Sequence, residues 1–135
     1  MPEINTDRAA LYYLAGPMSG LPEYNYPAFE AACVFLRDVA LLCVRSPHEI
    51  KHGGRVRGDR PYTQYMIGGF RLLMECDRII MLPEWTSSKG ARRELDVALD
   101  CGMPAYIMSE DNTLRDLSSG EVFNPWRPQW RYCTS

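Results

Sequence analysis

Short apolar runs alternate along this chain with longer segments in which apolar residues recur at helical spacing. Turn residues bound the runs, which cover residues 11–15, 41–44, 77–82 and 105–108. The helical segments begin at Pro27 and then cover 62–74 and 88–101. This alternation is typical of parallel strands joined by crossover helices. We therefore predict an α/β fold in which helices flank a parallel sheet of four to five strands.

The length of the chain fits one such domain. Its 135 residues, 46% of them hydrophobic, are enough for one core and too few for two. We predict a single domain over residues 1–135 with a core over residues 11–108. Periodicity fades in the tail, residues 109–135, where Trp126 and Trp130 alternate with arginines. This tail is expected to dock against its own domain or against a second subunit.

Charge and composition exclude several functions. The 15 Lys and Arg residues against 17 Asp and Glu residues give a net charge of -2, so no positive field attracts a nucleic-acid polymer. The 5 cysteines show no CxxC spacing, and the 2 histidines have no clustered ligands beside them. We predict buried, reduced cysteines in a cytoplasmic protein. We expect no metal, no cofactor, no signal peptide and no membrane span.

Three loops are expected to meet where ligands bind in such a sheet, outside the carboxyl ends of the strands. They cover residues 16–26, 46–60 and 83–90. The first loop offers backbone amides and a hydroxyl to a phosphate or sugar, from Gly16, Pro17, Met18, Ser19 and Gly20. The same loop offers rings and an amide to a planar base, from Tyr24, Asn25 and Tyr26. These three residues are equally suited to packing at the start of a helix.

The second loop begins with His48 and Glu49, at the end of a strand. A histidine after a strand is more often structural than catalytic, but an imidazole titrates near neutral pH and suits acid–base work. Residues 51–61 make this connection longer than most in compact domains, and long loops are usually functional or mobile.

The helix expected at 88–101 places a carboxylate among apolar residues. At about 100° per residue, Glu94 falls between Cys101 and Ala98 on the apolar arc, which also includes Leu99. A carboxylate there needs a hydrogen-bonding partner or a chemical role, because desolvation raises its pKa. Glu94 is therefore either a satisfied buried glutamate or a nucleophile or general base.

The start of the same helix carries Ser87, Ser88 and Gly90. Unpaired amides and the helix dipole favour an anion at this position. A serine here is also a common N-cap, and the two roles are compatible.

Several segments form a specific set when taken in order. They are 13–20 (Tyr-Leu-Ala-Gly-Pro-Met-Ser-Gly), 24–29 (Tyr-Asn-Tyr-Pro-Ala-Phe), 76–77 (Cys-Asp), 82–85 (Leu-Pro-Glu-Trp) and 88–94 (Ser-Lys-Gly-Ala-Arg-Arg-Glu). The set resembles the small phage and bacterial proteins related to nucleoside 2-deoxyribosyltransferases, over residues 12–106. This resemblance implies a Rossmann-like (flavodoxin-like) sheet and a homodimer or larger assembly in which a neighbouring subunit completes the site.

The resemblance also implies a chemistry. In that superfamily a helix glutamate attacks C1′ of the sugar, expels the base and forms a covalent glycosyl-enzyme, as in a retaining glycosidase. Glu94 matches this nucleophile. The spacing of Ser88, Gly90 and Glu94 is similar to that of the nucleoside 5′-monophosphate N-hydrolases, in which the serine and helix amides hold the phosphate. The implied ligand is a nucleotide or nucleoside, bound by the loop residues above together with Asp77.

One position departs from the family pattern. Relatives commonly carry a second catalytic aspartate eight residues before the one that Asp77 matches, whereas this chain has Gly69 there. Either His48, Glu49, Asp59 or a water serves the departing base, or the base leaves without acid help, or the protein binds a nucleotide without fast turnover. The missing side chain is also expected to leave room for a larger base.

Three functions remain as alternatives at this stage. The first is an N-glycosidase that hydrolyses the base–sugar bond of a (deoxy)nucleoside 5′-monophosphate. The second is a nucleoside 2-deoxyribosyltransferase, which shares the same first step. The third, of a different class, is a nucleotide-binding or sensing module with weak or no catalysis, and Gly69 is the reason to consider it.

Overall fold

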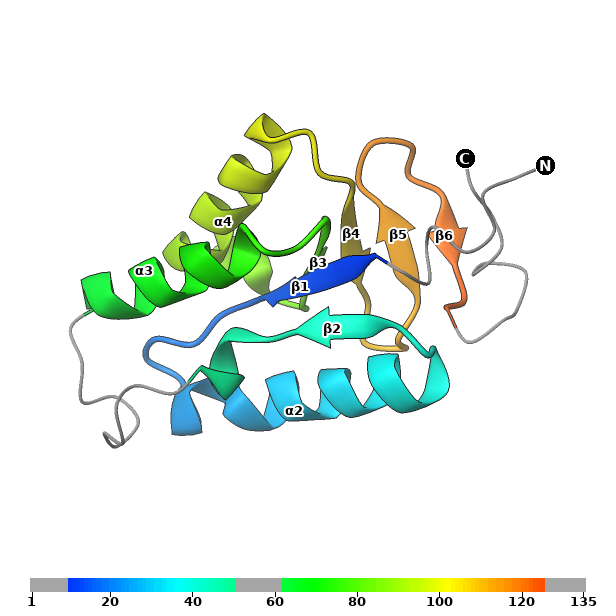
Figure 1. The fold of residues 1–135 in the computed structure, drawn as a ribbon. Helices are drawn as coiled ribbons and strands as arrows, with labels where there is room; N and C mark the ends of the chain where they lie inside the picture. Colours follow the sequence, from blue (N-terminus) through cyan, green and yellow to red (C-terminus); the bar gives the residue numbers. More distant parts are fainter. Residues whose placement is uncertain (1–9, 51–61, 126–135) are drawn as a thin grey trace.

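A central sheet with helices on both faces forms the body of the protein in the computed structural model, which describes residues 10–50 and 62–125 (Figure 1). The strand order is β2-β1-β3-β4-β5-β6. Parallel pairing joins the first four of these, which are β1 (Leu11–Ala15), β2 (Cys43–Arg45), β3 (Arg78–Met81) and β4 (Ala105–Met108). The predicted flavodoxin-like α/β fold is confirmed, but the sheet is mixed and has 6 strands instead of four to five parallel ones.

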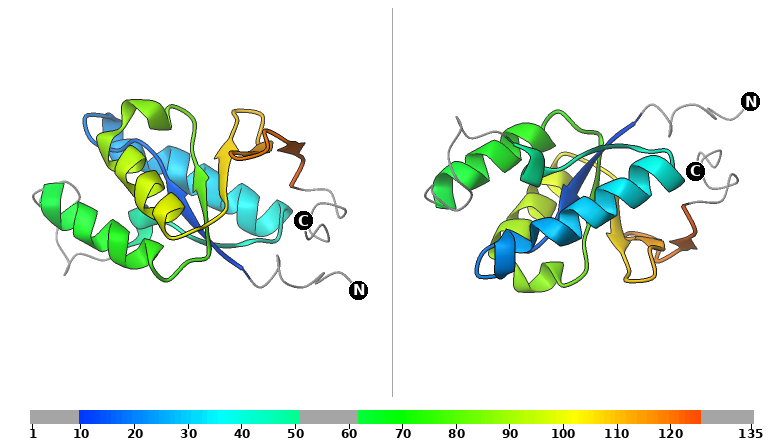
Figure 2. Two further views of the ribbon diagram at one scale, coloured as in Figure 1. Left: turned by 90° about the horizontal axis from the view of Figure 1, so that it is seen from above. Right: turned by 90° about the horizontal axis from the view of Figure 1, so that it is seen from below.

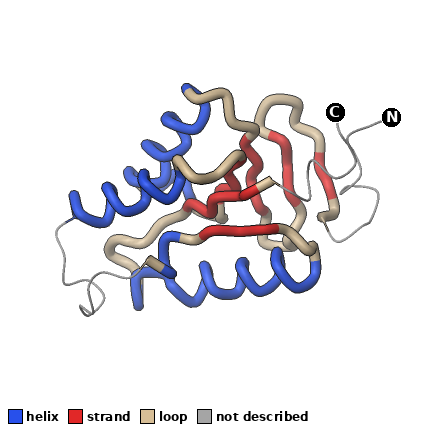
Figure 3. The backbone as a smooth tube through the Cα atoms, in the orientation of Figure 1, coloured by secondary structure: helices blue, strands red, loops and turns tan. Residues whose placement is uncertain are grey.

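Two further strands lie in the segment predicted as a tail, so that prediction was wrong for residues 109–125. β5 (Leu114–Asp116) pairs antiparallel with β4, and β6 (Val122–Phe123) pairs antiparallel with β5 (Figure 3). Strands of 3 and 2 residues are too short to show a periodic pattern. Turn chemistry defines them instead, because the Asp116 carboxylate accepts hydrogen bonds from the residues that reverse the chain. Residues 126–135, with both predicted tail tryptophans, lie outside the described residues.

Three main helices connect the parallel strands. They are α2 (Tyr26–Val34), which continues as a π-helical turn (Phe35–Val39), α3 (Tyr62–Leu73) and α4 (Lys89–Asp100). Single 3-10 turns occupy Pro22–Asn25, Pro47–Glu49 and Trp85–Ser87. Helix α2 covers one face of the sheet, and α3 and α4 lie together over the other (Figure 2). None of the helices in the described ranges is long and apolar enough to cross a membrane.

The core consists of two clusters, one on each face of the sheet. In β1, Tyr12 and Leu14 join the cluster beneath α2, whereas Tyr13 and Ala15 join the cluster beneath α3 and α4. All four are completely buried. Side chains of a strand alternate between its two faces, and so a strand covered on both faces is a continuous apolar run. This is why the run at 11–15 predicts a central strand.

The buried face of α4 is narrower than the arc expected from helical spacing. Its buried residues are Ala91, Glu94, Leu95 and Ala98, whereas Leu99 is 47% exposed and Cys101 is exposed. Only the residues that point at the sheet and α3 are covered, so the rim of the arc faces solvent.

The cysteines divide in a similar way. Cys33 and Cys76 are buried as expected, but Cys43 is exposed like Cys101. Cys43 lies in β2, the edge strand, which has a neighbour on one side only. The prediction that the cysteines are buried was therefore wrong at two of the described positions, Cys43 and Cys101.

Gly16 is required where β1 ends beside β3. A Cβ atom added there would lie 2.9 Å from Leu82 Cβ and 3.1 Å from Leu82 Cδ1. We expect Gly16→Ala to lower the free energy of unfolding by about 1–3 kcal/mol, because the core has no free volume for the methyl group. Urea denaturation measures the change, with the exposed Glu110→Ala as a control expected within about 0.5 kcal/mol of the parent. An unchanged midpoint for Gly16→Ala would contradict this close packing.

Candidate active site

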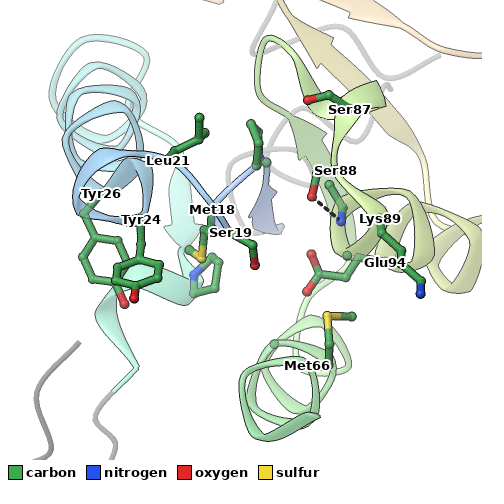
Figure 4. Close-up of a pocket in the computed structure, with 16 residues that line it drawn as sticks. Met18, Ser19, Leu21, Tyr24, Tyr26, Met66, Ser87, Ser88, Lys89 and Glu94 are labelled. Atoms are coloured by element: carbon green, nitrogen blue, oxygen red, sulfur yellow. Dashed lines mark hydrogen bonds between the residues drawn. The ribbon is translucent and has the colours of Figure 1, made fainter. Parts of the chain in front are cut away.

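A pocket of about 570 Å³ lies at the carboxyl ends of the parallel strands, where the loops after β1, β2 and β3 meet. The structure brings most of the predicted site residues to its wall. These are Gly16, Pro17, Met18, Ser19, Tyr24, Tyr26, Ser87, Ser88, Gly90 and Glu94. Tyr24 and Tyr26 stand on one side, and Glu94 and Lys89 stand on the other (Figure 4).

Five predicted residues do not line this pocket. Asp77 lies at the amino end of β3, the opposite end of the strand, and its carboxylate accepts a hydrogen bond from Leu11 N at 2.9 Å. Gly20 and Asn25 lie in the loop after β1, where Asn25 bonds Pro17 O. His48 bonds Glu30 of α2, and Glu49 bonds Arg37 of the π-helical turn. Among the described residues, the lining therefore comes mainly from the first and third loops and from helices α3 and α4. The described part of the second loop contributes Pro47, and the rest of that loop, with Asp59, lies outside the described residues.

Sequence reasoning missed several lining residues. The apolar Leu21, Pro47 and Met66 carry no chemical signal of their own, and Met66 comes from α3, an element that the three-loop expectation does not include. Lys89 was overlooked between two predicted residues, although a cation at a helix start beside serines is a recognisable signal for an anion.

Glu94 lies at the base of the pocket with its carboxylate directed inward (Figure 4). Glu94 lies in the second turn of α4 and is only 7% exposed. The Tyr13 hydroxyl, from the neighbouring β1, donates a hydrogen bond to Glu94 Oε2 at 2.5 Å. The sequence left open whether Glu94 is satisfied or reactive, and the structure shows that one of its oxygens has a buried protein partner.

Burial changes the acidity of this pair. Desolvation raises the pKa of Glu94 from its ordinary value of 4.5 to about 7, and the hydrogen bond from Tyr13 acts in the opposite direction. Desolvation, and then the charge of Glu94, raises the pKa of Tyr13 well above its ordinary value. Tyr13 therefore stays protonated as a donor, while Glu94 changes its charge near neutral pH. A buried carboxyl group whose pKa is shifted toward neutrality is typical of catalytic sites.

The position of Gly69 against Glu94 and Tyr13 explains why α3 contains a glycine here, although glycine has a low helix propensity. A Cβ atom added to Gly69 would lie 2.5 Å from Glu94 Oε2 and 3.0 Å from the Tyr13 hydroxyl. The bare backbone of α3 thus lets the carboxylate and the hydroxyl meet against it. The expectation that Gly69 leaves room for a larger base was wrong, because Glu94 and Tyr13 already occupy the adjacent space.

The side of the pocket formed by Tyr24 and Tyr26 depends on an uncommon backbone turn. Glu23, Tyr24 and Asn25 have φ values of 51°, 54° and 60°, a left-handed conformation that non-glycine residues adopt at an energetic cost. Asn25 Nδ2 donates a hydrogen bond to Pro17 O at 2.9 Å. This bond ties the turn to the loop after β1, so Asn25 supports the pocket from behind.

The start of α4 forms the polar end of the pocket. Ser88 is the N-cap, and its Oγ accepts a hydrogen bond from Ala91 N at 3.1 Å. The Ser87 hydroxyl donates to Glu84 O at 2.7 Å. Together with Lys89 and the unhindered Gly90, these groups surround the positive end of the helix dipole. Such an end of a pocket suits an anionic group of a ligand.

A family model matches residues 10–107, and its description is a domain of unknown function, DUF4406. The chain belongs to the DUF4406 family. The match covers the pocket, β1, β2, β3 and β4 as far as Ile107, and it ends before the β5–β6 hairpin. No curated protein sequence matches the chain significantly.

Two solved structures share the fold of this DUF4406 domain. A 2-deoxyribosyltransferase from the psychrotolerant bacterium Bacillus psychrosaccharolyticus has a TM-score of 0.55 and 23% identity, over 85% of this chain and 77% of that one. A conserved protein from Enterococcus faecalis V583 also has a TM-score of 0.55, with 17% identity over 76% of this chain and 69% of that one. The DUF4406 domain therefore has the fold of the 2-deoxyribosyltransferases.

One group of side chains in the DUF4406 domain has the composition of a metal site. Cys33, His48 and Glu49 bring their ligand atoms within 4.8 Å of one another. Each of the last two is already engaged, because His48 bonds Glu30 and Ser46, and both Glu49 oxygens accept from Arg37 at 2.8 Å. The group lies outside the lining of the pocket, and its contacts join α2 to the segment after β2.

Removing the Tyr13 hydroxyl tests its influence on Glu94. We expect Tyr13→Phe to raise the pKa of Glu94 above its value of about 7 by about 1–2 units, since the lost bond stabilises the charged form. A titration of the side-chain carboxyl carbon by NMR measures the shift. Tyr12→Phe, which alters the other face of the same strand, is the matched control and should leave the titration unchanged. Equal titrations in all three proteins would show that Tyr13 does not influence Glu94.

Proposed function

We propose that this pocket cleaves the N-glycosidic bond of a (deoxy)nucleoside 5′-monophosphate, with Glu94 as the nucleophile. The observation that carries the proposal is a carboxylate, 7% exposed, that points into a pocket at the carboxyl ends of parallel strands. The hydrogen bond from Tyr13 engages Oε2, so Oε1 is the oxygen assigned to C1′ of the sugar. Carboxylate attack at an oxocarbenium-like carbon is the chemistry of retaining glycosidases.

The mechanism uses the surroundings of Glu94 in two ways. Attack by Oε1 on C1′ breaks the bond to the base and gives a glycosyl ester, which water then hydrolyses to regenerate the carboxylate. Tyr13 holds the carboxylate in one orientation during both steps. The buried position keeps the ionised carboxylate poorly hydrated, which favours its attack on a carbon that becomes positive.

The other lining residues are assigned to the phosphate and the base of a nucleotide. Ser88, Lys89 and the start of α4 are assigned to the 5′-phosphate, because cation, hydroxyl and helix dipole all favour an anion. Tyr24 and Tyr26, on the opposite wall, are assigned to the planar base. The pocket volume of about 570 Å³ falls within the usual range of about 300–1,000 Å³ for small-ligand sites.

A panel assay tests the proposal directly. Purified protein is incubated with each ribo- and deoxyribonucleoside 5′-monophosphate, and mass spectrometry measures free base and sugar phosphate. We expect release from at least one member, and none from the matching nucleoside without phosphate at equal concentration. Faster release from the unphosphorylated nucleoside would contradict the assignment of the α4 start to a phosphate.

The rate of base release is expected to depend on the ionisation of Glu94. The nucleophile must be charged, and burial holds its pKa at about 7. The rate should therefore rise about tenfold per pH unit below pH 7 and level off above it. Base release measured from pH 5 to pH 9 under single-turnover conditions gives the profile. A rate that falls as pH rises through 7 would contradict an ionised nucleophile.

A second candidate is a nucleoside 2-deoxyribosyltransferase, which would pass the sugar from Glu94 to another base instead of water. The observation that favours it is the likeness to the Bacillus psychrosaccharolyticus 2-deoxyribosyltransferase. An isotope-labelled free base added with an unlabelled deoxynucleoside distinguishes the two. Label in the nucleoside pool supports transfer, whereas release of base without exchange supports hydrolysis.

A third candidate is a nucleotide-binding module, and Gly69 is the observation behind it. No described residue of α3 supplies a carboxylate to the pocket. A nucleotide that raises the melting temperature without yielding any product, at any pH tested, would favour this candidate over both enzymes.

A further inference from the structure

The proposed reaction has two tasks, attack on C1′ of the sugar and protonation of the departing base, and the described lining of the pocket offers one carboxyl group for both. Among the described residues that line it, Glu94 is the single carboxylic acid, and the other ionisable side chains are Lys89, Tyr24 and Tyr26. Ammonium and phenol groups are much weaker acids than a carboxyl group. Once Glu94 acts as the ionised nucleophile, it has no proton to give to the departing base. This step rests on the proposed function.

The candidate acids that the structure describes are committed elsewhere, and Asp59 lies outside the described residues. Tyr13 is completely buried, and its hydroxyl already donates to Glu94 Oε2. The His48 side chain is 6% exposed and bonded to Glu30, and Glu49 is paired with Arg37. None of these groups lines the pocket.

The helix that faces Glu94 cannot add an acid without moving the nucleophile. At Gly69, even a Cβ atom would stand 2.5 Å from Glu94 Oε2. A longer acidic side chain at this position would have to start from that same atom. The geometry that positions the nucleophile therefore excludes a proton donor from this part of α3.

We propose that the base leaves as an anion, without a proton from any of the described residues, and that the substrates are nucleotides whose base is stable as an anion. Glu94 Oε1 forms a bond to C1′ while the electron pair of the C1′–N bond departs with the base nitrogen. The negative charge spreads into the ring carbonyl groups, and water protonates the base after it has left. Water then attacks the glycosyl ester and regenerates the Glu94 carboxylate.

This chemistry selects a class of bases. Uracil rings with electron-withdrawing groups at C5 give the most stable anions, because two carbonyl groups and the substituent share the charge. Cytosine has one carbonyl group and gives a much less stable anion. The class expected as substrates is therefore the electron-poor 5-substituted uracils, with thymine and uracil slower and cytosine slowest.

A leaving-group series tests the proposal. The substrates are 2′-deoxyuridine 5′-monophosphates with hydrogen, methyl, fluorine, chlorine or nitro at C5, together with the cytosine nucleotide. Base release is followed by rapid quench with protein in excess over substrate, so that the first chemical step is measured and not hydrolysis of the ester. Two pairs separate electronic effects from size, namely hydrogen with fluorine and methyl with chlorine. Glu94→Gln is the control for contaminating activity.

The expected result is a steep dependence on the acidity of the base. The rate should rise between about threefold and about tenfold for each unit by which the pKa of the leaving nitrogen falls. A nearly level dependence with Glu94-dependent release would overturn the inference while leaving the proposed function intact, because it would show a proton donor at the base. Absence of release from every member of the series would overturn the inference, and the proposed function would fall with it only if the full panel of nucleoside 5′-monophosphates also gave no release.

Discussion

Replacing Glu94 by glutamine is expected to abolish cleavage of the glycosidic bond, with a loss of about 10⁴-fold or more in kcat. The amide keeps the size of the carboxylate and still offers an oxygen to the Tyr13 hydroxyl, but it cannot form the glycosyl ester. Binding should persist, because the phosphate and base contacts lie on other residues of the lining. Base release by mass spectrometry and binding by calorimetry measure the two effects. Unchanged turnover would remove Glu94 from the mechanism.

The same variant makes a second prediction that needs no substrate. The folded state raises the pKa of Glu94 from 4.5 to about 7, so the folded protein holds the proton more tightly than the unfolded chain. The corresponding stability is fully present below pH 4.5 and is lost as pH rises through 7. The loss amounts to about 3 kcal/mol for a shift of this size.

Glutamine has no proton to lose and should escape this penalty. We expect Glu94→Gln to match the parent near pH 4 and to exceed its free energy of unfolding by about 3 kcal/mol at pH 8. Urea denaturation at pH 4, 6 and 8 measures the difference. A difference that is the same at all three values would mean that Glu94 has an ordinary pKa in the fold. A residue that lowers stability at the working pH is typical of a site selected for chemistry.

Replacing Gly69 by alanine is expected to lower kcat about 100-fold, because one methyl group displaces the nucleophile. The added Cβ would lie 2.5 Å from Glu94 Oε2 and 3.0 Å from the Tyr13 hydroxyl. Either the carboxylate or α3 must move by a large part of an ångström, and a misplacement of about 1 Å costs about 100-fold in well-organised sites. Binding of nucleotide should change much less than kcat. Single-turnover base release and calorimetry separate the two quantities.

Gly68→Ala is the matched control for this variant. It makes the same chemical change one residue earlier in α3, at a position that does not line the pocket, and it improves helix propensity by about 1 kcal/mol. We expect parental kcat and equal or higher stability. If both variants lost activity alike, the effect would come from the helix as a whole and not from contact with Glu94.

Local patterns in the sequence determine the parallel half of this fold. The strands at 11–15 and 105–108 have the predicted bounds, because a strand buried on both faces is a bounded apolar run. Ser88 is the predicted N-cap of α4, since capping depends on a few adjacent residues. The β5–β6 hairpin cannot be predicted in this way, because its strands of 3 and 2 residues are too short to show a periodic pattern.

The candidate site follows from the sequence only in part. Helical spacing alone places Glu94 on the buried face of α4. The residue types of the loop after β1 predict that Tyr24 and Tyr26 line the opposite side of the pocket. Tertiary structure decides that Tyr13 meets Glu94 across a separation of 81 residues and that Gly69 makes this contact sterically allowed. It also decides that His48 turns toward Glu30 and that Asp77 lies at the far end of its strand. Spacing along one element specifies which face a side chain occupies, whereas its partner depends on how separate elements pack.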